Sequence, residues 1–217
     1  MNPLRKVNTV LGVRRQAGWR GVLDSVDRRL RPYSRRIYLF ALSTPRPNPD
    51  AVGAAATHDM RFATPDELCA IRSRPDTTLS DNDLLAARKG DRCLLQLDGS
   101  TLVGYAWIAG SSLVYIADGF YIRLPDDTIY NYKAWTNPQY RGFGFQALRH
   151  LRLLEATAAE GVRRLFGYVD AVNFNSLHGV AKSGYERVGD LRITRRGGRA
   201  RVRLDVASDM WCDIRQV

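Results

Sequence analysis

The sequence has few cysteines and none of the spacings that cysteine-based sites require. Cys69, Cys93 and Cys212 are widely separated, and they include no Cys-x-x-Cys pair. An odd, scattered set of this kind argues against a disulfide framework and against a cysteine zinc site. We therefore expect neither structural disulfides nor a cysteine zinc site.

Long apolar runs are also missing. The longest, such as Ile37 to Leu42, is far shorter than the roughly 20 residues that a spanning helix needs, and the first ten residues hold no secretory core. These absences predict a cytoplasmic protein. With 217 residues, 45% of them hydrophobic and 25% charged, the chain suits one large globular domain with or without an appendage, and not a disordered or collagen-like chain.

Lysine is scarce, with 4 residues against 29 arginines, and the formal net charge is +11. Ten basic residues against Asp24 and Asp27 give residues 1–36 a net charge of +8, which leaves +3 for the other 181 residues. Such a segment could attract nucleic acid, a carrier protein, an anionic membrane or an anionic substrate. Alternatively, the arginines reflect genome base composition and merely solvate one helix face.

The basic segment also has a helical pattern. Its apolar residues recur at steps of three and four, and Pro32 ends the run. The residues on this face are Trp19, Val22, Leu23, Val26 and Leu30. The pattern predicts a basic amphipathic helical extension over residues 1–35 and a separate main domain over 36–217.

The main domain alternates strand-like and helix-like stretches. A strand is expected over 36–42, and the proline-rich stretch 43–64 is expected to be a connecting loop. Capping residues and acidic first turns predict helices that begin at Thr64-Pro65-Asp66-Glu67 and at Ser80-Asp81-Asn82-Asp83.

Further elements follow towards the C-terminus. The Asp98-Gly99 pair predicts a hairpin turn between strands 91–97 and 101–109. The other expected elements are β-structure over 114–123, a strand over 128–136, a helix over 143–160, a strand over 163–169, a helix over 174–183 and a final hairpin around 195–198. This order predicts an α/β (α+β) domain, a mixed sheet flanked by helices.

A glycine-containing loop joins the strand 128–136 to the helix that follows it. The stretch runs from Thr136 to Gln146, and Gly142 and Gly144 let its backbone approach a ligand closely. The free N–H groups of the following helix turn would then form an anion site suited to a pyrophosphate.

A second motif, Asn173-Phe-Asn-Ser176 followed by Lys182-Ser-Gly184-Tyr185, also comes after a strand. Together the two stretches resemble the P-x-Y-R-G-x-G and N-x-x-S…K-x-G-F/Y signatures of the GNAT superfamily, the Gcn5-related N-acetyltransferases. The resemblance covers about residues 90–190. It implies a mixed, mostly antiparallel twisted sheet flanked by helices.

The resemblance also implies a donor and its binding residues. Acetyl-CoA or another acyl-CoA would be the co-substrate, and no metal would be needed. The pyrophosphate would be held by the amides of Arg141, Gly142, Phe143, Gly144, Phe145 and Gln146. The main chain of Ala134, Trp135 and Thr136 would hold pantetheine and the thioester carbonyl, with Asn173 and Ser176 of the second motif contributing to the same site.

Two residues depart from the family pattern. Gln146 stands where the loop usually has a small residue, and Val180 stands where many members carry the tyrosine that protonates the leaving thiolate. Valine cannot donate a proton, so water or a neighbour such as His178, Tyr168 or Tyr185 would do so.

Other catalytic assignments stay open. Asp170 and His178 are candidate bases, as are Asp126 and Asp127, and Tyr168 is a further catalytic candidate. Tyr130 and Tyr132 share a strand face and are expected either to line the acceptor pocket or to pack the sheet.

These observations predict an N-acyltransferase that transfers acetyl from acetyl-CoA to a primary amine of a small or sugar-like acceptor by direct attack. One alternative is a transferase of the same fold that uses an aminoacyl-tRNA or an acyl carrier protein as donor. The other is a non-catalytic CoA-binding protein, for which Val180 is the main argument. The sequence leaves the oligomeric state open, a homodimer included.

Overall fold

A computed structural model describes residues 33–74, 77–117, 119–196, 199–206 and 213–216. The chain divides into two compact units, one formed by Ile37–Asp190 with Leu204–Val217 and the other by Met1–Arg36 with Leu191–Arg203. Of the basic helix predicted over residues 1–35, residues 1–32 lie outside the described residues. Strand β1 (Tyr33–Leu42) begins three residues before the predicted strand, so Tyr33, Ser34 and Arg35 are extended.

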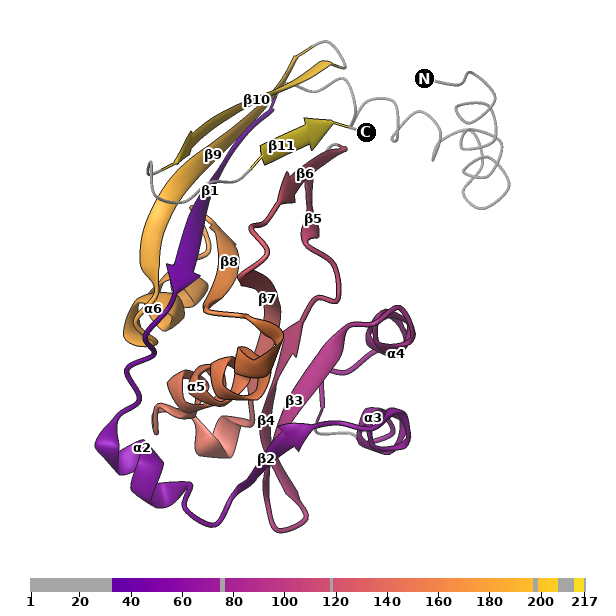
Figure 1. Ribbon diagram of the computed structural model, residues 1–217, viewed down its shortest axis with the longest axis vertical. Coiled ribbons are helices and arrows are strands. Elements are labelled where there is room, and N and C mark those ends of the chain that lie inside the picture. Colours follow the sequence, from indigo (N-terminus) through magenta and orange to yellow (C-terminus); the bar gives the residue numbers. More distant parts are fainter. Residues whose placement is uncertain (1–32, 75–76, 118, 197–198, 207–212, 217) are drawn as a thin grey trace. The chain divides into compact units, whose positions relative to one another are not determined.

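The first unit, which we call the cleft unit, is built on a mixed sheet (Figure 1). Its strands lie in the order β1-β8-β7-β4-β3-β2. Besides β1, these are β2 (Asp59–Phe62), β3 (Arg92–Asp98), β4 (Thr101–Ile108), β7 (Thr128–Thr136) and β8 (Arg164–Asp170). Only the β7–β8 pair is parallel among these described pairings, which confirms the predicted mixed, mostly antiparallel sheet.

Helices cover both faces of this sheet. They are α2 (Pro49–Ala54), α3 (Pro65–Arg72), α4 (Asp81–Arg88), α5 (Phe145–Thr157) and α6 (Phe174–Lys182), with short 3-10 turns at Pro138–Tyr140 and Ala158–Glu160. Side chains along β4 point alternately to the two faces of the sheet, so neighbouring residues of this strand pack in two different cores. Tyr105 and Trp107 pack with α3 and α4, whereas Ala106 and Ile108 pack with α5 and α6.

The remaining strands form smaller structures. Strands β5 (Leu113–Ala117) and β6 (Phe120–Arg123) pair antiparallel, and β11 (Asp213–Gln216) pairs with β6. Strands β9 (Glu186–Arg196) and β10 (Arg199–Val206) are neighbours and flank residues 197–198, the centre of the predicted final hairpin, which lie outside the described residues. No helix of the described ranges is long and apolar enough to cross a membrane.

The prediction of a connecting loop over 43–64 is wrong. The stretch contains α2 and β2, and β2 pairs with β3 from Asp59 opposite Leu97 to Phe62 opposite Leu94. Pro49 is compatible with the helix because it occupies the first turn, where a backbone N–H has no intrahelical partner. The side chain of Asn48 caps the same turn by accepting from Asp50 N at 3.1 Å.

The two short helices and the first hairpin are confirmed. Thr64 and Glu67 form a capping box at α3, and Ser80 and Asp83 form one at α4. In the hairpin, Asp98 faces Thr101, so Gly99 and Ser100 are the turn residues, one position later than predicted. Gly99 has φ 56°, the positive value that hairpin turns require at their first central position.

Candidate functional site

Strands β7 and β8 separate after a short paired segment. Their parallel register runs from Thr128 opposite Arg164 to Tyr130 opposite Phe166. Beyond that point, β7 remains paired with β4 and β8 remains paired with β1. Each strand therefore turns an unpaired backbone edge towards the other, with N–H and C=O groups that need partners.

A cleft of about 730 Å³ opens between these two edges. Its walls are residues 131–136 of β7 and residues 167–169 of β8, together with residues of the loop after β7, of α5 and of the segment from α6 to β9. The latter are Tyr140, Arg141, Gly142, Gly144, Phe145, Gln146, Ala147, His150, Asn175, Ser176, Gly179, Val180, Lys182, Ser183 and Tyr185. An extended ligand with amide groups could pair with the open edge of β7 as an additional strand does.

The loop at one end of the cleft presents backbone amides. Gly142 and Gly144 have φ 89° and 85°, values that strain any residue with a Cβ. Gly144 is the N-cap of α5 and has no side chain to cap it, so the amides of Phe145 and Gln146 have no intrahelical acceptor. The loop therefore offers N–H donors and a partial positive charge to an anion.

A buried arginine lies behind this loop. Arg149 of α5 is fully buried and donates from Nη1 to Gln96 Oε1 at 2.7 Å and from Nη2 to Thr136 Oγ1 at 2.5 Å. No described carboxylate pairs with it, and burial lowers its pKa to about 10, so it stays charged at neutral pH. Because Arg141 Nε also donates to Thr136 O, at 3.2 Å, two guanidinium groups hold the end of β7.

The sequence motifs do not predict the buried position of Arg149, but one residue of β4, Gly104, is a sign of it. Gly104 interrupts the apolar residues of β4, and a Cβ there would lie 2.6 Å from Arg149 Nη1 and 2.5 Å from Trp135 O. A mid-strand glycine often marks such a close approach.

His150 was likewise not predicted. It lines the cleft, is buried, and neither ring nitrogen has a hydrogen-bond partner among the described residues. Burial and the nearby charge of Arg149 lower its pKa to about 3, so the ring is neutral at physiological pH. Its neighbour Tyr185 packs edge-on at 5.3 Å between ring centroids, and burial raises the pKa of that tyrosine.

Three tyrosines cluster on the α3 and α4 side of β7 and β8. The ring of Tyr130 stacks on Tyr168 at 5.5 Å and lies 5.6 Å from Tyr132. Tyr132 and Tyr168 line the cleft, whereas Tyr130 lies behind them. Burial raises the pKa of Tyr130 and Tyr132, which keeps both hydroxyls protonated.

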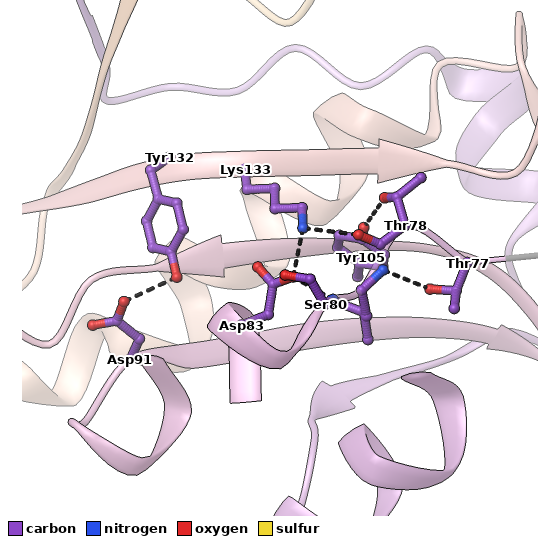
Figure 2. A network of polar contacts seen from close by, with 9 residues as sticks. Thr77, Thr78, Ser80, Asp83, Asp91, Tyr105, Tyr132 and Lys133 are labelled. Atoms are coloured by element: carbon purple, nitrogen blue, oxygen red, sulfur yellow. Dashed lines mark hydrogen bonds and ion pairs between the residues drawn. The ribbon is translucent and has the colours of Figure 1, made fainter. Parts of the chain in front are cut away.

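Two groups of polar contacts lie beside these tyrosines (Figure 2). Lys133 Nζ donates to Asp83 Oδ2 at 2.8 Å and to Thr78 O at 3.1 Å, and Tyr132 Oη donates to Asp91 Oδ2 at 2.9 Å. Burial alone would raise the pKa of Asp83, but the bonds from Lys133 and Ser80 outweigh burial and lower it. Asp83 is therefore ionised and occupied, which makes it a poor base.

The predicted catalytic candidates are placed differently from one another. Tyr168 lines the cleft, with its hydroxyl 3.4 Å from the carbonyl oxygen of Tyr115. His178 is exposed on α6 and does not line the cleft. Asp170 ends β8, where its Oδ1 accepts from Val172 N at 3.2 Å, and it does not line the cleft either.

Most of the predicted donor-binding residues line the cleft. Ala134, Trp135 and Thr136 do so along β7, and so do the loop residues except Phe143, which is half exposed and stacks on Phe145. Asn173 is exposed and caps α6 by accepting from Ser176 N at 3.1 Å, whereas Ser176 itself lines the cleft.

Cys93 and the candidate base Asp127 both have structural surroundings. Cys93 is buried in the core between the sheet and α3, and burial raises the pKa of its thiol. Asp127 accepts from Arg164 and Thr128, which lower its pKa against the effect of burial. Among the described residues, no group of three or more His, Cys, Asp or Glu could hold a metal ion.

Comparison with known proteins gives a likeness in structure and none in sequence. No family model matches the chain, and no curated protein matches it. A GCN5-related N-acetyltransferase-like protein from Streptococcus suis matches with TM-score 0.44 and 16% identity over 82% of this chain and 68% of that one.

Two further solved structures give similar values. AAC(6')-Iy, in complex with the bisubstrate analogue CoA-S-monomethyl-acetylneamine, has TM-score 0.47 and 14% identity over 60% of this chain and 91% of that one. A GCN5-related N-acetyltransferase from Sphaerobacter thermophilus has TM-score 0.46 and 15% identity over 84% of this chain and 58% of that one. At 14–16% identity, these matches show a likeness in fold alone.

Proposed function

We propose that this protein is an acyl-CoA-dependent N-acyltransferase that transfers acetyl from acetyl-CoA to a primary amine of a small or sugar-like acceptor. The observation that carries the proposal is the cleft between β7 and β8, which opens at the glycine loop and the first turn of α5. One cleft thus offers anion-binding amides at its loop end and an open strand edge along its length.

The residues present fit an acyl-CoA. The first-turn amides of Phe145 and Gln146 suit a pyrophosphate, and Arg141 adds a positive charge at the same end. The edge of β7 from Ala134 to Thr136 suits the amides of the pantetheine arm. Gln146 keeps its backbone N–H, so its larger side chain does not remove a donor from the loop.

Acyl transfer by direct attack depends on holding the amine and the thioester in the right orientation. The amine nitrogen bonds to the thioester carbonyl carbon, the carbon–sulfur bond breaks, and the sulfur takes a proton while the amine loses one. Within this cleft Val180 cannot supply a proton. Of the three predicted catalytic residues, only Tyr168 lines the cleft and carries a hydroxyl there, so we assign it the proton-donating or acceptor-orienting role.

The position of Tyr132 and Tyr168 supports an acceptor site on the α3 and α4 side of the cleft. Their rings form an aromatic wall with Tyr130 behind it. Flat aromatic rings are suited to the apolar faces of a sugar-like ring, and their edges and hydroxyls are suited to its polar groups.

An acceptor screen tests the activity. Purified protein is incubated with acetyl-CoA and a panel of primary amines, and free thiol is measured against time. We expect thiol release with at least one acceptor and a fall of about 10-fold or more for Tyr168→Phe at unchanged acetyl-CoA affinity. Tight acetyl-CoA binding without release for any amine would favour the non-catalytic binding protein, and absence of binding would favour a different donor.

A further inference from the structure

The second unit carries an arginine-rich sheet face that the cleft does not use. Residues 191–203 include six arginines and no acidic residue, and they belong with residues 1–36 to the unit that excludes the cleft. These residues add to the basic segment at 1–36, which has a net charge of +8. The described strands show a second basic region, formed by β9 and β10.

Burial alternates along both strands. In β9, Leu191 and Ile193 are buried, whereas Arg192, Thr194 and Arg196 are exposed. In β10, the small or apolar residues at 200 and 202 are half-buried, whereas Arg199, Arg201 and Arg203 are exposed. Because side chains alternate between the two faces of a sheet and neighbouring strands share those faces, five arginines lie on one face.

This face, which we call the arginine face, is defined by Arg192, Arg196, Arg199, Arg201 and Arg203. No ion pair among the described residues involves any of the five. Alternate residues of a strand are about 7 Å apart, so Arg199, Arg201 and Arg203 form a regular row of positive charge. Five unneutralised guanidinium groups so close together repel one another unless an anionic partner approaches.

We propose that the arginine face binds the phosphate backbone of a nucleic acid duplex. Guanidinium groups donate two hydrogen bonds to one phosphate, and a row of them matches a polymer of phosphates better than a single small anion. Neither β9 nor β10 contains an aromatic residue on which an unpaired base could stack, which favours a duplex over a single strand. Contacts to phosphates carry no base information, so binding through this face would not depend on base sequence.

The composition of the face disfavours a membrane as the partner. A surface that enters a lipid headgroup region generally adds large apolar or aromatic side chains to its basic ones. The exposed large hydrophobic residues of the described chain, Val52, Leu85, Tyr115, Phe143, Val172 and Phe174, all belong to the cleft unit.

The proposal is tested by duplex binding at several salt concentrations. The full chain is titrated into a fluorescein-labelled DNA duplex and an RNA duplex of the same mixed sequence, between about 50 and 200 mM salt. The test variant carries Arg199→Gln, Arg201→Gln and Arg203→Gln. We expect the slope of log Ka against log salt to become less negative by about 2.7, since each phosphate contact contributes about 0.9.

A matched control removes the same charge elsewhere. Arg88→Gln, Arg123→Gln and Arg163→Gln alter three exposed arginines of the cleft unit. This variant should keep the slope of the unmodified protein. If both triple variants lower the slope equally, only net charge matters and the arginine face is not a binding site.

Two further measurements, one on a charge-preserving variant and one with lipid vesicles, complete the test. A charge-preserving triple variant, with Lys at 199, 201 and 203, should retain most of the slope, which guards against loss of binding through misfolding. Anionic phosphatidylserine vesicles serve as the competing partner. Binding to these vesicles without binding to either duplex would overturn the proposal in favour of a membrane surface. Since none of the five arginines lines the proposed acyl-CoA cleft, neither result bears on the acyltransferase assignment.

Discussion

The two units of this chain differ sharply in how they would recognise a ligand. Residues 1–36 carry a net charge of +8 and residues 191–203 add six arginines, which leaves the cleft unit a formal charge of −3 out of the total of +11. The cleft is lined by strand edges and loop amides, whereas the other unit presents guanidinium groups on a sheet face. Backbone geometry would set specificity in the former and charge density in the latter.

The largest expected effect comes from a substitution that impairs the cleft and leaves the arginine face unchanged. Gly144→Glu places a carboxylate and a strained backbone, from φ 85°, at the loop proposed to hold pyrophosphate. We expect CoA affinity measured by calorimetry to fall more than about 100-fold, which corresponds to about 2.7 kcal/mol. Duplex binding should stay unchanged.

Gly161→Glu is the matched control for this variant. Gly161 has nearly the same φ, 83°, and a Cβ there would have open space around it, but it lies at the end of the helical segment after α5 and does not line the cleft. The two substitutions therefore cause similar backbone strain, but only Gly144→Glu lies at the cleft. If both variants lose CoA affinity to the same degree, the effect comes from instability and the loop is not the pyrophosphate site.

A smaller effect is expected behind the cleft. Gly104→Ala would bring a Cβ to 2.5 Å from Trp135 O and 2.6 Å from Arg149 Nη1, so the end of β7 or the guanidinium must move. We expect the free energy of unfolding in urea to fall by about 1–3 kcal/mol. Gly53→Ala in α2, where a Cβ meets nothing within 4 Å, should instead stabilise by about 0.4–1 kcal/mol. Equal effects of the two would mean that Arg149 is not tightly packed against Gly104.

A last prediction concerns the pH dependence of the stability of the cleft unit. His150 is neutral in the folded cleft unit with a pKa of about 3, and it protonates near pH 6.5 when the chain unfolds. A depressed histidine pKa means that the unfolded state binds more protons, so stability should fall by up to about 1.4 kcal/mol per unit as pH decreases from 6.5. His150→Leu should flatten that dependence in urea titrations between pH 6.5 and 4.5. A pH dependence retained by His150→Leu would assign the effect to other groups.

Local patterns predicted the parts of the fold that local chemistry determines. Strand β7 matches residues 128–136, and the capping boxes at Thr64 and Ser80 mark the helices that follow them. The prediction of a loop over 43–64 is wrong because proline does not always break a helix. Pro49 instead starts a helix, which depends on Asn48 capping it and on Ala51 being buried against the core.

The features that escaped prediction depend on distant residues. A buried charge at Arg149 requires Gln96 on β3, Thr136 on β7 and the space above Gly104, which no single segment discloses. The arginine face requires β9 and β10 to lie side by side with alternating burial. The cleft motifs were visible because a glycine loop before a helix is a contiguous pattern, whereas the catalytic roles of Asp170, His178 and Tyr168 depend on where each side chain lies.

Hydrogen–deuterium exchange with and without CoA tests the central claim most directly, because it locates the ligand on the backbone. We expect slower exchange along β7 from Asn131 to Thr136 and in the first turn of α5, with exchange in β9 and β10 unchanged. Protection confined to other segments, or none at saturating CoA, would contradict the assignment of the cleft to an acyl-CoA.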